Sequence, residues 1–136
     1  MSKAIPLIQK YMTTTPHSIG RDQTLAKAQS MMSEHRIRHL PVLADGQLVG
    51  ILSDRDLRLA LSLKGVSAET TQVGEIANEE AFLVKPDSKL DEVAQMMAEK
   101  KIGSVLVVDH HRLVGIFTTT DALVALGELL HTRLTH

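Results

Sequence analysis

The chain has 136 residues, 43% of them hydrophobic and 23% charged, with a formal net charge of −1 at pH 7. Near-neutral charge, one Tyr, two Phe and no Trp exclude the basic surface that duplex nucleic acid requires and the aromatic platforms of single-strand binders. The absence of cysteine excludes thiolate metal sites and disulfides, and the lack of a secretory pattern or of an apolar run near ~20 residues favours a soluble cytoplasmic protein without membrane segments.

The first half of the chain predicts two helices and a β-hairpin. In chain order these are an extended piece at 18–19, a helix from Leu25 with Asp22 at its mouth, a hairpin of 40–43 and 48–52 around Asp45-Gly46, and a helix that opens at Ser53. Apolar residues at helical spacing support the first helix, and the Asp-Gly turn between two apolar runs supports the hairpin. Each unit is therefore predicted to be β-α-β-β-α.

The second half repeats the first. The stretch Leu25 to Leu61 recurs without insertion as Leu90 to Leu126, and 13 of the 37 paired positions are identical. The repeat predicts an extended piece at 83–84, a helix from Leu90 preceded by Asp87, a hairpin of 105–108 and 113–117 around His110-His111, a helix that opens at Thr118, and a continuation of that helix through 128–136.

The duplication predicts one module made of two units, 1–66 and 67–136. A unit of about sixty residues buries only about 60% of its unfolded surface and is marginal alone, so two copies are expected to share a core. The polar segment 65–72 is the predicted linker. The fold class is α/β (α+β), and function is expected at the joint between the copies.

Both helix openings carry the same signature: Gly, two apolar residues, Ser or Thr, two residues, then Asp. It reads Gly50 to Asp56 in the first copy and Gly115 to Asp121 in the second. A hydroxyl and free N–H groups at a helix N-terminus accept phosphate, and an Asp one turn later suits a ribose diol. The same residues also match a capping box, which only satisfies helix amides. The pattern alone leaves both interpretations open.

This signature, the segment Arg36 to Val42 and its counterpart Lys101 to Val108 resemble CBS domains, and the tandem copy resembles a Bateman module over essentially the whole chain. The resemblance implies two β-α-β-β-α halves related by pseudo-twofold symmetry, clefts that bind AMP, ADP, ATP or S-adenosylmethionine, and a disc-like homodimer formed through the helices. It implies a regulatory module that is not an enzyme, with no catalytic cofactor and an effector protein that the sequence does not name.

The resemblance also implies two sets of ligand-binding residues. The main cleft is expected to use Asp121 for the ribose, with Thr118 and Thr120 beside it and a wall formed by Thr13, His17, Ile37, Arg38 and His39. The second cleft is expected to use Asp56 for the ribose, with Ser53, Arg55, Asn78, Phe82, Ile102, Gly103 and Ser104. The main cleft is the favoured nucleotide site, because its helix opening is neutral and Arg38 or His39 can neutralise phosphate.

Two alternatives accompany this interpretation. The chain could instead be a protein interaction or dimerisation module in which the clefts are vestigial and the Ser, Thr and Asp residues are caps. An enzyme acting on nucleotides lacks an identifiable base or metal cage. The histidines at 110, 111, 131 and 136 are expected to be solvated rather than metal ligands, and the methionine pairs at 31–32 and 96–97 are expected to pack in the core or a dimer contact.

Overall fold

The computed structural model describes residues 4–134. The chain forms two compact units, and each has its own sheet and core. We call Pro16–Ala81 the continuous unit. The split unit combines the leading segment up to Thr15 with the chain from Phe82 onward. The predicted copies, 1–66 and 67–136, describe the sequence duplication and remain a prediction; the compact units divide the chain differently, because the leading segment of the first copy folds onto the sheet of the second.

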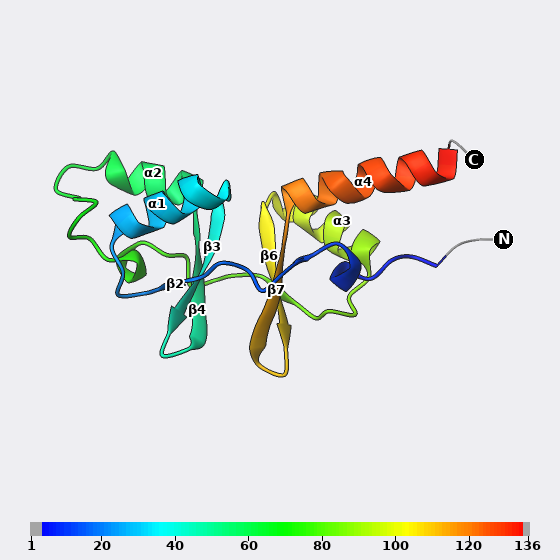
Figure 1. Ribbon diagram of the computed structural model, residues 1–136, viewed down its shortest axis with the longest axis horizontal. Helices are drawn as coiled ribbons and strands as arrows, with labels where there is room; N and C mark the ends of the chain where they lie inside the picture. The colour runs from blue at the N-terminus through cyan, green and yellow to red at the C-terminus, as the bar shows by residue number, and fades with distance from the viewer. Residues whose placement is uncertain (1–3, 135–136) are drawn as a thin grey trace. The chain divides into compact units, whose positions relative to one another are not determined.

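The continuous unit has a three-stranded sheet of order β2-β3-β4 with helices packed against it (Figure 1). Its elements are β2 (Ile19–Gly20), α1 (Leu25–His35), β3 (His39–Ala44), β4 (Gln47–Ser53), α2 (Asp54–Leu61) and the 3-10 helix η2 (Val73–Glu75). β2 pairs with β3 in parallel, and β3 pairs with β4 in an antiparallel hairpin. The predicted β-α-β-β-α order is confirmed in this unit.

The split unit repeats this arrangement and adds a strand. Its elements are η1 (Ile8–Lys10), β1 (Thr13–Thr14), β5 (Leu83–Val84), α3 (Leu90–Lys100), β6 (Ser104–Asp109), β7 (Arg112–Thr118) and α4 (Thr119–Leu134). The sheet order is β1-β7-β6-β5, so the leading segment supplies an edge strand antiparallel to β7. The sequence did not predict this strand.

Both hairpins turn through residues with positive φ. Asp45 and Gly46 have φ values of 52° and 78°, and His110 and His111 have 50° and 66°. Two consecutive left-handed residues make the tight turn that matches the twist of antiparallel strands. The predicted hairpins are confirmed, although the His-His turn has no glycine to relieve the backbone cost.

The helix stripes predicted from the sequence form the two cores. Leu25, Ala28 and Met32 of α1 are buried in the continuous unit, and Leu90, Val93 and Met97 of α3 are buried in the split unit. The other residue of each methionine pair is partly buried against the same core. The expected packing role of the methionines is confirmed.

The helix starts differ in detail from the prediction. Thr24, rather than Asp22, is the N-cap of α1, and its side chain accepts a hydrogen bond from the Lys27 N–H at 3.2 Å. Lys89, rather than Asp87, is the N-cap of α3 and makes no side-chain capping bond. The aspartates lie too far upstream, since a capping side chain must reach an N–H within the first turn.

The predicted linker 65–72 is a structural part of the continuous unit. The carbonyls of Thr71 and Ala68 accept hydrogen bonds from the N–H groups of Leu25 and Ala26, at 3.0 and 2.8 Å. These bonds satisfy amides that have no partner within α1. The segment is therefore hydrogen-bonded to the start of α1, and its role as the linker between the two sequence copies remains a prediction.

Candidate functional site

In the split unit, a group of hydrogen-bonded residues surrounds the junction between the C-terminal end of β7 and the start of α4. We call it the Asp121 corner, comprising Thr13, Gly103, Thr118, Thr119 and Asp121. The Thr118 N–H donates to Asp121 Oδ2 at 3.0 Å, and the Asp121 N–H donates to Thr118 Oγ1 at 3.4 Å. This reciprocal pair is a capping box. Thr118 Oγ1 also donates to Asp121 Oδ2 at 3.2 Å.

The other carboxylate oxygen of Asp121 faces the leading segment. The Thr13 hydroxyl donates to Asp121 Oδ1 at 3.4 Å, a separation of 108 residues along the chain. Asp121 and Thr118 are half-buried, whereas Thr13 is exposed. The corner therefore presents an oriented carboxylate whose Oδ1 is the more weakly engaged oxygen.

The start of β6 fixes the first residue of α4. Both the N–H and the hydroxyl of Thr119 donate to the Gly103 carbonyl, at 3.0 and 3.3 Å. The signature glycine has a separate role. A Cβ at Gly115 would lie 2.6 Å from Met12 Sδ and 3.0 Å from the Thr13 carbonyl oxygen. The glycine is thus required for the close passage of the leading segment over β7.

The equivalent group in the continuous unit is the Asp56 corner, comprising Arg38, Ser53, Asp54, Asp56 and Asn78. Ser53 caps α2 by accepting from the Asp56 N–H at 3.0 Å, and the Asp54 N–H donates to the Arg38 carbonyl at 2.7 Å. The reciprocal bond, from the Ser53 N–H to the Asp56 carboxylate, is not formed among the described contacts. The Asp56 side chain is exposed, so this carboxylate is not oriented by the backbone as that of Asp121 is.

Asn78 occupies in this corner the place that Thr13 has in the other. It exchanges two backbone hydrogen bonds with Ile51, each 2.9 Å long, and its Oδ1 accepts from the Glu80 N–H at 2.9 Å. A Cβ at Gly50 would lie 2.6 Å from the Asn78 carbonyl oxygen. Both signature glycines therefore make room for a backbone that crosses the sheet edge.

Charge also distinguishes the corners. Asp54 and Asp56 both lie in the first turn of α2, and Asp54 is paired with Arg58 at 3.2 Å. His39, at the start of β3, is half-buried. Burial, and then the charge of Arg38, lower the pKa of His39 below its ordinary value of 6.5, and Asp54 and Asp56 oppose this shift.

The two predicted residue sets are distributed over both units. Of the main set, the split unit contains Thr13, Thr118, Thr120 and Asp121, and the continuous unit contains His17, Ile37, Arg38 and His39. Of the second set, the continuous unit contains Ser53, Arg55, Asp56 and Asn78, and the split unit contains Phe82, Ile102, Gly103 and Ser104. The structure bonds Thr13 and Thr118 to Asp121, and Ser53 to Asp56. The assembly of each full set remains a prediction.

Several predicted residues have structural partners of their own. The ring of His17 stacks on that of His35, with centroids 3.7 Å apart. The ammonium of Lys100 lies 5.5 Å from the centroid of the Phe82 ring, and the Phe82 carbonyl accepts from the Leu106 N–H at 2.9 Å. Pro41 occupies the position equivalent to Leu106. Because proline has no N–H, the first copy has no bond equivalent to the one between Leu106 and Phe82.

Sequence reasoning missed two features of these corners. The carbonyls of Arg38 and Gly103 accept hydrogen bonds from the first residues of α2 and α4. The sequence suggested a role only for the Arg38 side chain and for Gly103 as part of a cleft wall. Thr13 was assigned to the ligand, but its bond to Asp121 was not foreseen. The repeat gave no signal for this bond, since Asn78, the equivalent of Thr13, bonds to Glu80 and not to Asp56.

Metal-binding residues do not converge within residues 4–134, where no group of three or more His, Asp or Glu side chains could hold an ion. His110 instead contacts Asp109 at 2.9 Å in an exposed turn, and His136 lies outside the described residues. Across the same part of the chain, no helix has the length and apolar character that crossing a membrane requires.

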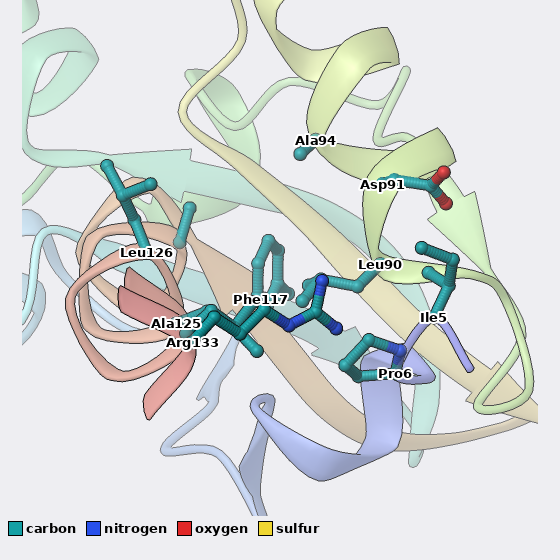
Figure 2. A pocket seen from close by; sticks show the side chains of 11 residues that line it. Ile5, Pro6, Leu90, Asp91, Ala94, Phe117, Ala125, Leu126 and Arg133 are labelled. Carbon is teal, nitrogen blue, oxygen red and sulfur yellow. The ribbon is translucent and has the colours of Figure 1, made fainter. Parts of the chain in front are cut away.

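The split unit also has an apolar groove of about 210 Å³ that shares no residue with the Asp121 corner. Figure 2 shows the side chains from α3, α4 and the leading segment that surround it. Small residues open this space: Ala94 and Ala122 stand where the first copy has Gln29 and Leu57. The groove has almost no polar lining, so it does not suit a nucleotide.

The CBS domain family model matches residues 8–63 and 73–128, one match in each predicted copy. The chain belongs to the CBS domain family. Each match contains one helix opening with its signature aspartate, so the two corners are equivalent parts of a tandem CBS pair.

Similar proteins support the same assignment. The chain is 34% identical over 122 residues to the CBS domain-containing protein YhcV of Bacillus subtilis, covering 90% of this chain and 81% of that protein. It is 35% identical over 104 residues to hypoxic response protein 1 of Mycobacterium tuberculosis, covering 76% and 73%. Both relatives are matched over most of their length.

Solved structures share the fold. The AcuB protein from Vibrio cholerae superimposes with a TM-score of 0.87 at 32% identity, covering 98% of both chains. The CBS domain pair of protein MJ0100, solved in complex with 5′-methylthioadenosine and S-adenosyl-L-methionine, gives a TM-score of 0.84 at 28% identity, covering 93% of this chain and 99% of that chain.

Proposed function

We propose that this CBS pair is a regulatory module that binds an adenosine-containing ligand, with Asp121 as the ribose-binding residue. The observation that carries the proposal is the state of the Asp121 carboxylate. Its Oδ2 is fixed by the Thr118 N–H at 3.0 Å, while its Oδ1 faces a hydroxyl at 3.4 Å. A carboxylate held in place before binding loses little freedom when it accepts the two hydroxyls of a ribose.

The neutral surroundings of Asp121 favour a phosphorylated ligand at this corner. The exposed hydroxyls of Thr119 and Thr120 stand at the N-terminus of α4, a helix of 16 residues. The N-terminus of a helix carries a partial positive charge, which attracts anions. AMP, ADP and ATP are therefore candidates, and the ligands of the MJ0100 pair add S-adenosylmethionine and 5′-methylthioadenosine to the set to be tested.

The remaining residues of the predicted main set stay part of the proposal. We infer that Arg38 and His39 contribute to the phosphate end of the ligand and that the second set, around Asp56, binds more weakly. The module would act by binding and not by catalysis. A ligand that binds one conformation more tightly than another shifts the population towards that conformation. Its effector would be a separate cytoplasmic protein.

Isothermal titration with AMP, ADP, ATP, S-adenosylmethionine and 5′-methylthioadenosine tests the proposal. Asp121→Asn is the main variant, since it keeps an oxygen for the Thr118 N–H but removes the charge and one acceptor. We expect it to weaken binding by at least about tenfold, the loss of about 1.4 kcal/mol. Asp56→Asn is the matched control and should leave the tighter of the two binding events unchanged, since it alters only the weaker set. No heat with any of the five ligands at millimolar concentration would end the proposal.

A second function is favoured by two observations: the complete capping box at Thr118 and Asp121, and an exposed apolar stripe on α4. Leu123, Leu126 and Leu130 are 62%, 53% and 48% exposed. Their spacing places them on one helix face, which supports a homodimer formed through α4. In an interaction module with vestigial sites, nucleotide would leave the melting temperature unchanged, whereas true binding raises it.

A further inference from the structure

The two oxygens of the Asp121 carboxylate differ in how many hydrogen bonds they already accept. Oδ2 receives two donors, the Thr118 N–H at 3.0 Å and the Thr118 hydroxyl at 3.2 Å. Oδ1 receives one, the Thr13 hydroxyl at 3.4 Å. Each carboxylate oxygen has two lone pairs. Oδ2 is therefore saturated within the protein, and Oδ1 has one lone pair left.

A ribose diol needs two lone pairs when both of its hydroxyls donate to one carboxylate. Because Oδ2 is saturated, both hydroxyls must use Oδ1, and one of its lone pairs is occupied by Thr13. The Thr13 bond is longer than the usual 2.7–2.8 Å of an O–H···O contact, so it is the weakest of the three. It is the bond that a ligand would replace.

We infer that Thr13 competes with the ligand for Asp121, so that the full diol contact and the Thr13–Asp121 bond exclude one another. This inference rests on the proposed function, because it describes how that same site is regulated. It changes the expected role of Thr13 from a residue that holds the ligand to one that opposes it. It also makes the second hydroxyl of the ribose the specificity element, since a ligand with one hydroxyl can use the free lone pair.

The position of Thr13 gives this exchange a structural consequence. Thr13 lies in β1 and pairs with Ile116 of β7, and the Met12 side chain beside it fills the space above Gly115. The bond to Asp121 is thus a side-chain link between the leading segment and α4. When a diol replaces this bond, the segment loses that link while the backbone pairing of β1 remains. Ligand occupancy is therefore coupled to the attachment of the leading segment within the split unit.

The corner of the continuous unit lacks this competition. Asn78 stands in the place of Thr13, and its side-chain oxygen accepts from Glu80 rather than engaging Asp56. Asp56 forms no side-chain hydrogen bond among the described residues. Only the second copy of the duplicated signature has an internal hydroxyl in the path of the ligand.

The test is a titration series on the whole chain with Thr13→Val, which removes the hydroxyl at nearly constant shape. We expect Thr13→Val to bind AMP and ATP about two- to tenfold more tightly than the wild type, the range of one exposed hydrogen bond to a carboxylate. Its affinity for 2′-deoxy-AMP and 2′-deoxy-ATP should be unchanged. Thr13→Ser keeps the hydroxyl and should match the wild type, and Thr14→Val controls for an added valine in β1.

The outcomes separate the two levels of the argument. Wild-type silence with all the nucleotides and with S-adenosylmethionine removes the proposed function and this inference together. Wild-type binding with Thr13→Val no tighter than Thr13→Ser removes the inference alone. Weaker binding by Thr13→Val means that Thr13 holds the ligand, and it overturns the inference while supporting the proposed site. An equal gain for the deoxy ligands would also overturn it.

Discussion

The close approach at Gly50 makes a quantitative prediction about the CBS signature. In Gly50→Ala, the new Cβ would lie 2.6 Å from the Asn78 carbonyl oxygen, about 0.8 Å short of ordinary contact, and 3.5 Å from Glu79 Cα. All of the nearby atoms belong to the backbone, so no side-chain rotation relieves the clash. Gly50 is not among the described residues with positive φ, so the effect is steric and not conformational.

The loss of stability depends on which part of the structure the new methyl group displaces. The crossing backbone at Asn78 is held by its two hydrogen bonds to Ile51, each 2.9 Å long. Moving it away stretches both bonds, and overpacking of this kind costs about 1–3 kcal/mol. At about 2 kcal/mol, the melting temperature of a chain of this length should fall by about 6–10 °C. Gly115→Ala is the matched variant, since its closest neighbour is the flexible Met12 side chain, and it should lose less.

Thermal unfolding followed by circular dichroism, with urea titration as a second measure, gives both values. Because neither glycine contributes a side chain to a ligand, the order of the two variants reports on packing alone. A Gly50→Ala protein as stable as the wild type, or more stable than Gly115→Ala, would refute the idea that the signature glycine is there for the crossing backbone.

Three further predictions use the same purified protein. Gly127→Ala, in α4, whose new Cβ would have no atom within 4 Å apart from the helix's own neighbouring backbone, should raise the unfolding free energy by about 1 kcal/mol in urea titration; no gain would mean that this space is filled. Because the folded pKa of His39 lies below 6.5, the unfolded chain takes up the proton first as the pH falls through 6.5, so stability is lost below that value. His39→Gln should then lose less stability than the wild type between about pH 7 and about pH 5, and equal losses would contradict the shift. Leu126→Glu should convert a dimer into a monomer in light scattering, Thr132→Glu should not, and a monomeric wild type would exclude the dimer.

The local structure of each copy was predictable because it is written in short-range patterns. Apolar spacing identified α1 and α3, and the Asp45-Gly46 turn between apolar runs identified the first hairpin. The second hairpin, with His110-His111 at its turn, has no such turn signal. It was found because the repeat transfers the assignment from one copy to the other.

The pairing of the leading segment with the sheet of the second copy was not predictable from these patterns. β1 is only two residues long, Thr13 and Thr14, and both are exposed, so it has no alternation of apolar and polar residues to detect. Its partner, β7, lies about a hundred residues further along the chain. Only the glycine at 115 hinted that a backbone passes close to that strand.

The candidate site shows the limit of a motif with two physical interpretations. Ser or Thr followed three residues later by Asp predicts a cap and a ligand site equally well. The structure shows that the caps differ: Thr118 and Asp121 form a reciprocal box, and Ser53 and Asp56 form half of one. This difference depends on where each carboxylate points, and the sequence of four residues does not determine that.

The division of the chain into a split and a continuous unit has a topological consequence. The backbone crosses from one unit to the other twice, between Thr15 and Pro16 and between Ala81 and Phe82. A single proteolytic nick at either crossing leaves the other covalent connection intact. Severing the gene at the repeat boundary would likewise separate β1 from the hairpin that it completes. Duplication has thus produced two halves that neither one cut nor one fission event can release as finished domains.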